Sequence, residues 1–240
     1  MRALFWAISY AACVLDRVAI FAAVAFGGGV GLAWFRLVPA LAGFGAFALG
    51  GLLSLVVAAL TVVGRLRGRQ LTLAGALSLA VSIVFVAIAA SGTNAPPIND
   101  FTTDFADPPV FVHAVMLPAN AGRDLGYPTD FAEIQRECCA DLRGTLVDAL
   151  PNEAFGRAAA TARSMPRWDV TYADAASGQI EAVATTVVFG FQDDVVIRVQ
   201  ASDDGASRVD VRSKSRDGRG DIGANAARIR TFIYELEKRT

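Results

Sequence analysis

Residues 39–69 read PALAGFGAFALGGLLSLVVAALTVVGRLRGR. The first 25 of these residues carry no charge, and three arginines, Arg65, Arg67 and Arg69, follow closely. A helix needs about 20 predominantly apolar residues to cross the hydrocarbon core of a bilayer. The stretch therefore predicts a transmembrane helix over about residues 39–63. A buried helix of a soluble bundle is the alternative, and the length of the uncharged run disfavours it.

Two further apolar stretches flank this one, at about residues 18–35 and 71–91. Backbone polar groups cannot stay unpaired in lipid, so a helix is expected for each. Residues 1–15 either extend the first helix or lie along the membrane interface. A cleaved signal peptide fits badly, because no A-x-A-like site follows a short apolar core. The sequence thus predicts a transmembrane domain of three helices over residues 1–92.

The short loops between these helices differ in their arginine content. Five arginines fall on one side of the predicted bundle and a single one, Arg36, on the other; the five are Arg2, Arg17, Arg65, Arg67 and Arg69. Positively charged loops stay in the cytoplasm. We therefore expect a multi-pass protein of the bacterial inner membrane with a cytoplasmic N-terminus and a periplasmic domain over residues 93–240.

The net charge differs between the two parts of the chain that hydropathy distinguishes, residues 1–92 and 93–240. Of 22 basic and 23 acidic residues, residues 1–92 hold six arginines and one acid, so the two parts carry net charges of +5 and −6. The acidic C-terminal part argues against general nucleic-acid binding, which needs a broad basic surface. The second and third helices contain no Asp, Glu, Lys or His, which disfavours a transporter.

Small residues recur at helical spacing in the first two predicted helices. Gly27 and Gly31 form one small-x-x-x-small step, reinforced by Gly28 and Gly29, and Ala46 and Gly50 form another. Small side chains at this spacing let helix backbones approach closely. We expect these residues to pack the bundle together, with association to another membrane protein as the alternative.

Residues 94–109 read NAPPINDFTTDFADPP and mark an abrupt change in composition. Proline, asparagine and aspartate favour turns, so the stretch predicts a linker or a surface loop. Asp100, Asp104 and Asp107 are interpreted as turn-forming residues. A calcium site is disfavoured, because their spacing does not match an EF-hand loop.

The C-terminal part predicts an α+β domain in which an antiparallel four-stranded sheet is packed with helices. Helical periodicity runs over residues 131–142, 152–165 and 222–238, and strand patterns run over 168–172, 179–189, 194–200 and 207–213. Turns are expected at residues 177–178, 192–193 and 203–205. In the last two strands, apolar residues alternate with charged ones.

Two blocks of the sequence resemble the DUF1499 family. They are PPINDFTTDFADPP at residues 96–109 and a longer block that begins GFQDDVVIRV at 190 and continues SRVDVRSKSRDGRGDIGANAARIRTF over 207–232. The similarity spans about residues 95–237. It implies a domain with no established biochemical function that often follows N-terminal membrane helices, which supports the predicted layout.

The loop over residues 213–225 is the strongest functional candidate. Together with nearby strand residues it supplies the candidate binding set Arg198, Arg212, Lys214, Arg216, Arg219 and Asn225. Arginines beside the start of a helix favour an anion such as a phosphate or a carboxylate, and Asp221 is placed to cap that helix. The structural alternative is that Arg198 and Arg212 pair with Asp193, Asp194 and Asp210.

Other chemistry has weaker support. His113 is the only histidine, so a zinc site or a histidine-dependent triad is disfavoured, and its apolar neighbours suit an ordinary strand position. Cys138 and Cys139 are expected to remain thiols or to bridge to another chain. The aspartate pairs at 193–194 and 203–204 are interpreted as turn residues. No cofactor or metal is predicted.

We therefore expect a membrane-anchored interaction or envelope-assembly module, which includes the role of accessory subunit in a membrane complex. Its expected partners are the lipid bilayer and another membrane protein or an anionic lipid headgroup. The alternative is an enzyme or a binder of a small ligand or lipid headgroup that uses the arginine-rich site. The sequence leaves open the ligand, the oligomeric state and any catalysis.

Overall fold

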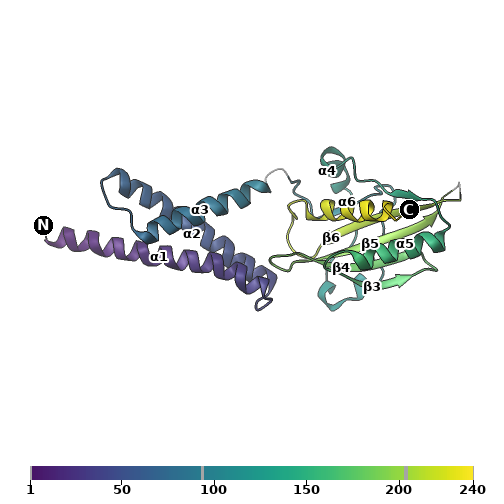
Figure 1. Ribbon diagram of the computed structural model, residues 1–240, viewed down its shortest axis with the longest axis horizontal. Helices are drawn as coiled ribbons and strands as arrows, with labels where there is room; N and C mark the ends of the chain where they lie inside the picture. Colours follow the sequence, from purple (N-terminus) through teal and green to yellow (C-terminus); the bar gives the residue numbers. More distant parts are fainter. Residues whose placement is uncertain (1, 93–94, 203–204, 240) are drawn as a thin grey trace. The chain divides into compact units, whose positions relative to one another are not determined.

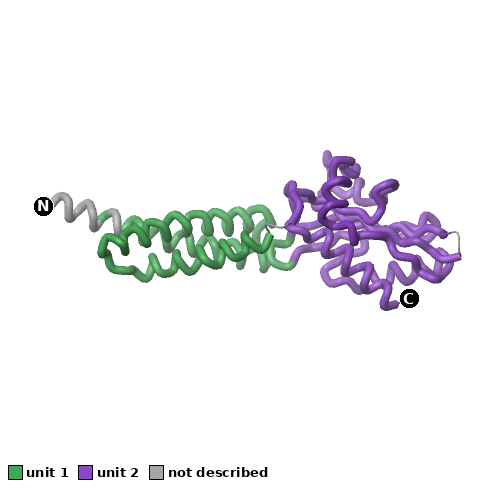
Figure 2. The backbone as a smooth tube through the Cα atoms, turned by 90° about the horizontal axis from the view of Figure 1, so that it is seen from above, with its two compact units in different colours: residues 1–93, 187–190 green, residues 94–186, 191–240 purple. Residues whose placement is uncertain are grey.

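The structure, a computed structural model, describes residues 2–92, 95–202 and 205–239 (Figure 1). The chain divides into two compact units, which Figure 2 distinguishes by colour. Unit 1 holds residues 1–93 and 187–190, and unit 2 holds residues 94–186 and 191–240.

Unit 1 contains the helices α1 (Arg2–Trp34), α2 (Ala40–Leu66) and α3 (Leu73–Ser91). Within the described residues, each includes a stretch long and apolar enough to cross a membrane; for α1 this stretch is Cys13–Trp34. The helix α1 begins at Arg2, so the first residues extend the first helix. The hydroxyl of Thr72 accepts the Gly75 N–H at 3.0 Å and so caps the start of α3.

Glycines bring α1 and α2 close together, but only some of the predicted ones do so. A Cβ atom on Gly29 would lie 2.6 Å from the Gly43 carbonyl oxygen, and one on Gly50 would collide with the backbone of α1. Close packing is therefore confirmed at Gly50. It is wrong at Gly27 and Gly31, where an added Cβ meets nothing within 4 Å. Positions two residues apart in a helix point in directions that differ by roughly 200°. Gly29 therefore lies on the opposite face of α1 from Gly27 and Gly31.

Unit 2 is built on a six-stranded antiparallel sheet in the order β1-β6-β5-β4-β3, and β2 also pairs with β6. The strands are β1 (Asp100–Thr102), β2 (Thr145–Val147), β3 (Trp168–Asp174), β4 (Gln179–Thr185), β5 (Gln192–Ala201) and β6 (Ser207–Ser215). The helices are α4 (Phe131–Cys138), α5 (Pro151–Ser164) and α6 (Ala224–Glu237), with short 3-10 turns η1 (Ala114–Met116) and η2 (Pro118–Asn120).

The expected four strands are thus too few, although the antiparallel α+β class is confirmed. The strand β1 lies inside the stretch expected to be a loop, and its Asp100 stands opposite Lys214 of β6. The strand β2 places Thr145 opposite Val209, farther along β6. Each added strand has only three residues, which is too short to show the two-residue period by which strands are recognised.

The β4 strand is shorter than expected because residues 187–190 belong to unit 1. There the ring of Phe189 lies 5.4 Å from the rings of both Phe44 and Phe47. Arg36 also donates hydrogen bonds to the carbonyls of Val187 and Val188. The chain therefore leaves the sheet after Thr185.

The main core lies between the sheet and the helices α5 and α6, which cover the same face in Figure 1. Strand residues Val195, Ile197, Val209 and Val211 pack there with helix residues Ala158, Ala162, Ile229 and Phe232. The ring of Trp168 stacks on that of Phe232 at 5.7 Å. The alternation predicted for the last two strands is confirmed.

Two local predictions are wrong. Asp193 and Asp194 lie within β5 and are buried, because Arg228 and Arg216 each approach one of these carboxylates to 2.6 Å and neutralise it. His113 lies in no strand and instead precedes η1. The turn predicted at Asp203 and Asp204 falls outside the described residues.

A candidate ligand pocket

The sheet face opposite α5 and α6 is charged. Successive side chains of a strand point to opposite faces, so Asp210, Arg212 and Lys214 of β6 face away from the core that Val209 and Val211 enter. Residues of the 103–127 segment cover this second face, where a small cluster of Phe111, Ala114, Leu125 and Val196 is buried.

A buried ion triad lies at the edge of this face. The carboxylate of Asp100 accepts two bonds from Arg212, one from Nε at 2.9 Å and one from Nη2 at 2.7 Å. Lys214 Nζ lies 2.9 Å from the same carboxylate. All three residues are buried. Two cations and one carboxylate leave an excess of one positive charge, which needs further acceptors in a medium of low dielectric constant.

Backbone carbonyls of the covering segment, residues 103–127, provide some of these acceptors. Arg212 donates to the carbonyls of Pro109 at 3.2 Å and Leu125 at 2.7 Å, and Lys214 donates to that of Gly126 at 3.1 Å. The triad therefore ties the covering segment to β6. Every guanidinium N–H of Arg212 except one at Nη1 has an acceptor in these contacts.

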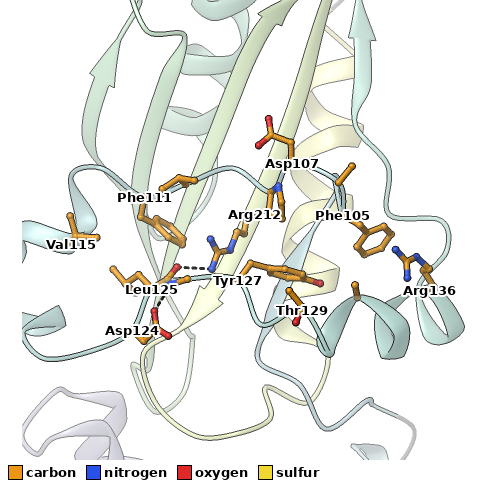
Figure 3. Close-up of a pocket in the computed structure, with 15 residues that line it drawn as sticks. Phe105, Asp107, Phe111, Val115, Asp124, Leu125, Tyr127, Thr129, Arg136 and Arg212 are labelled. Atoms are coloured by element: carbon orange, nitrogen blue, oxygen red, sulfur yellow. Dashed lines mark hydrogen bonds between the residues drawn. The ribbon is translucent and has the colours of Figure 1, made fainter.

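A pocket of about 750 Å³ opens beside the triad (Figure 3). Arg212 is one of the residues that line it, and its guanidinium carbon lies 5.0 Å from the ring centre of Phe111 and 5.4 Å from that of Tyr127. The other walls come from Phe105, Val110, Val115 and Ala132. The volume is in the range of pockets that hold small organic ligands, and such pockets combine apolar walls with a few polar groups.

Two polar groups flank the aromatic walls. Burial raises the pKa of the Tyr127 phenol, and the negative charge of Asp100 raises it further, against the opposing effect of Arg212. Tyr127 therefore stays protonated and keeps a hydroxyl donor. The guanidinium of Arg136 is exposed and lies 5.0 Å from the ring centre of Phe105. Within the described part of the chain, Arg136 forms no ion pair.

A buried carboxylate on β4 holds one pocket wall in place. Glu181 is 1% exposed and accepts the N–H groups of Val112 at 2.6 Å, His113 at 3.0 Å and Ala114 at 2.7 Å. These donors begin the η1 turn, so a negative charge at this position is favourable. Glu181 is a positioning residue, because it fixes the segment that carries Val110 and Val115.

The predicted binding residues fall into separate surroundings. Arg198 lies 2.7 Å from Asp107, 3.2 Å from Asp104 and 3.5 Å from Asp210. The pairing expected between Arg198 and Asp210 is therefore present, whereas Arg212 pairs with Asp100 and not with the three acids named for it. Arg212 pairs with Asp100 because β1, which carries Asp100, lies beside β6 in the sheet.

The other predicted members lie around the loop that precedes α6. Arg216 contacts the Asp194 carboxylate through Nε and Nη2. Asn225 is buried and bonds to Ser213 and Ser215. Arg219 is exposed and has no ion pair among the residues described. Anion or partner contact at this loop remains a prediction.

The N-cap residue of α6 is Gly223 and not Asp221, which was predicted to cap this helix and instead binds its first turn from two residues earlier. The carboxylate of Asp221 accepts the N–H groups of Gly223 at 2.8 Å and Asn225 at 2.6 Å. Burial raises the pKa of Asp221, and these hydrogen bonds oppose that rise. The carboxylate thus serves the turn into α6.

The cysteines are free thiols. Cys138 is exposed and Cys139 is buried. Desolvation raises the pKa of Cys138 to about 12, and a hydrogen bond with Cys139 adds to the rise. A thiol with so high a pKa stays protonated at neutral pH and is a poor nucleophile.

Sequence reasoning missed Tyr127 and Arg136, which line the pocket. It also missed the buried roles of Asp100, which pairs with Arg212, and of Glu181, which binds the N–H groups of one wall. Glu181 had a recognisable signal, since it is the single acid in the apolar run IEAVA over residues 180–184, and a charged residue amid such a run is buried only with partners. Tyr127 and Arg136 had no such signal in the sequence. The contact of Tyr127 with Arg212 and that of Arg136 with Phe105 depend on how the covering segment folds back over the sheet.

Residues 100–236, more than half of the chain, match the model of one protein family, described as a protein of unknown function (DUF1499). No curated protein matches the chain.

Proposed function

The chain belongs to the DUF1499 family, and from that premise we propose that it is a membrane-anchored binding module whose C-terminal domain faces the periplasm and holds a small ligand. The observation that carries the proposal is the pocket beside Arg212, whose buried guanidinium lies against aromatic walls and has one N–H without an acceptor among the described residues. Such a combination of apolar surface and one convergent polar group is typical of ligand sites.

The pocket supports the ligand-binding alternative that the sequence left open, but at a different place from the arginine-rich loop. Arg198 and Arg216 already have carboxylate partners at 2.7 Å and 2.6 Å. Arg136 and Arg212 line the pocket, and among the described residues Arg136 has no ion pair and one Nη1 N–H of Arg212 has no acceptor.

Filling the pocket tests this proposal. Ala132 lines the pocket on α4, so Ala132→Trp is expected to occupy its volume and reduce by about tenfold any small molecule that copurifies with the full chain from native membranes. Native mass spectrometry of the detergent-solubilised protein measures the adduct. Ala140→Trp is the matched control, because Ala140 is exposed and lies outside the pocket lining. Equal adducts in both variants would contradict the proposal.

The orientation of the domain rests on the loop arginines. Three of them, Arg65, Arg67 and Arg69, lie at the junction of α2 and α3, and such loops remain cytoplasmic. Alkaline phosphatase fused after Thr240 is therefore expected to be active in bacterial cells. The same reporter fused after Arg69 is expected to be inactive. The opposite pattern of activities would place the domain in the cytoplasm.

A second candidate function is protein interaction or envelope assembly, including a role as an accessory subunit. It is favoured by exposed apolar side chains at Val110, Val112, Val115 and Met116, because contiguous exposed apolar surface marks interaction sites. Crosslinking in native membranes through this segment distinguishes the two functions: a partner protein attached there supports the second.

A further inference from the structure

We propose that the pocket takes a single-chain amphiphilic anion, a molecule with one apolar chain and a carboxylate or phosphate head. This inference rests on the proposed function and names the ligand class of the same site. The head would lie between Arg136 and Arg212, and the chain would lie along the aromatic walls and an exposed apolar lip. The apolar lip is formed by Val110, Val112, Val115 and Met116.

Charge favours an anion. The triad of Asp100, Arg212 and Lys214 carries one uncompensated positive charge behind the pocket. Arg212 is 1% exposed and, within the described part of the chain, has one Nη1 N–H without an acceptor. An anion binds a buried cation that has an unsatisfied donor more strongly than it binds an exposed cation. The reason is that little solvent screens the buried contact.

The aromatic rings argue against a cationic ligand. Aromatic faces attract cations, but guanidinium groups of this chain already lie against the three rings of the pocket. Arg212 lies against Phe111 and Tyr127 at 5.0 and 5.4 Å, and Arg136 lies against Phe105 at 5.0 Å. A second cation at these rings would meet like charge, whereas an anion would meet the guanidinium of Arg136 and the remaining Nη1 N–H of Arg212.

The acids of the pocket leave one side open to a negative head. The carboxylate of Asp107 is held by Arg198 at 2.7 Å. Asp124 accepts the N–H of Gly126 at 2.8 Å. Figure 3 shows Arg136 and Asp124 at opposite ends of the pocket, so an anion at the Arg136 end avoids the Asp124 carboxylate.

The lip accounts for the apolar part of the ligand. Its four side chains lie within seven residues and are exposed to 66% at Val110, 44% at Val112, 50% at Val115 and 69% at Met116. Burial of such surface is favourable because it removes apolar groups from water, and Val110 and Val115 also line the pocket. A chain that leaves the pocket over this lip would cover apolar surface that water otherwise meets.

Photocrosslinking tests the inference on the full chain in phosphatidylcholine nanodiscs. The probe is dodecanoate with a diazirine at the chain terminus, and mass spectrometry locates the crosslinked peptides. Crosslinks are expected in residues 105–136, and unlabelled dodecanoate should suppress them while dodecanol, which has no charge, should not. A parallel competition with dodecanoyl lysophosphatidate distinguishes the two heads, since the stronger competitor carries the preferred one.

Matched variants separate a specific head contact from partition into the bilayer. Arg136→Gln removes an exposed charge and should lower the yield of pocket crosslinks by about tenfold. Arg163→Gln removes another exposed arginine, at the end of α5, and should leave the yield unchanged. Crosslinks in the helices α1 to α3 serve as the internal reference for probe that dissolves in lipid.

Two outcomes would overturn the inference. A site that selects for charge binds dodecanoate better than dodecanol, so equal competition by the two rules out an anion site. Crosslinks confined to the helices rule out an amphiphile in the pocket. If either occurs while Ala132→Trp still removes the native adduct, the ligand class is wrong and the proposed function stands. If that adduct also persists, both fail.

Discussion

Replacement of Asp100 by asparagine is expected to lower the free energy of unfolding of the C-terminal unit by about 3–5 kcal/mol. Asparagine keeps the volume of the side chain but removes the carboxylate that Arg212 and Lys214 share. Both cations would then be buried without a counter-charge. Breaking one side of a buried ion pair costs more than the pair itself contributes, because the remaining charge cannot recover its hydration.

Hydrogen exchange of the β5 and β6 amides in the full chain measures this effect, since the slowest amides exchange only when the sheet unfolds. Asp107→Asn is the control. Its carboxylate also contacts an arginine, Arg198, but the side chain is 73% exposed, so the expected loss is about 1 kcal/mol or less. Similar losses in both variants would show that the triad does not stabilise the fold in the way described.

Replacement of Glu181 by alanine is expected to release the segment that forms one pocket wall. The N–H groups of Val112, His113 and Ala114 would lose their acceptor. Unsatisfied buried donors cost about 1–3 kcal/mol each, so the segment should open to water instead of remaining in place. Protection of these amides should fall by about a hundredfold, the equivalent of roughly 3 kcal/mol of local stability.

The conservative variant Glu181→Gln retains one acceptor oxygen and should show an intermediate loss of protection. Glu153→Ala removes a glutamate whose side chain is 63% exposed and should leave these amides unchanged. Because Val110 and Val115 line the pocket, Glu181→Ala should also weaken retention of the native adduct. Unchanged protection at residues 112–114 would mean that other contacts hold the wall.

Much of the fold could be predicted because its signals are local. The long apolar helices and the alternation in β5 and β6 each follow from a period that a short window of sequence displays. The strands β1 and β2 could not be predicted, because a three-residue strand exists only through its partner β6. The buried position of Asp194 was missed for a similar reason: its partner Arg216 lies on the neighbouring strand end.

The candidate site was predicted less well than the fold. Arg212 was singled out from the sequence, but as part of an anion-binding loop, whereas the structure directs it to Asp100 and the pocket. A basic residue in a sequence has many acids within possible reach, and the choice among them depends on strand register. Register is set by the whole sheet and not by the residues beside the arginine.

By itself the sequence determined that the chain has three apolar helices and an α+β domain, because hydropathy and periodicity are properties of neighbouring residues. Its similarity to the DUF1499 family rests on two blocks of sequence and is equally readable without a structure. Only the tertiary structure decided which acid neutralises each arginine and where a cavity remains. Those outcomes depend on atoms from segments far apart in the chain, as in the contact of Asp100 with Arg212. Burial then gives that contact its strength, since it removes the water that would otherwise screen both charges.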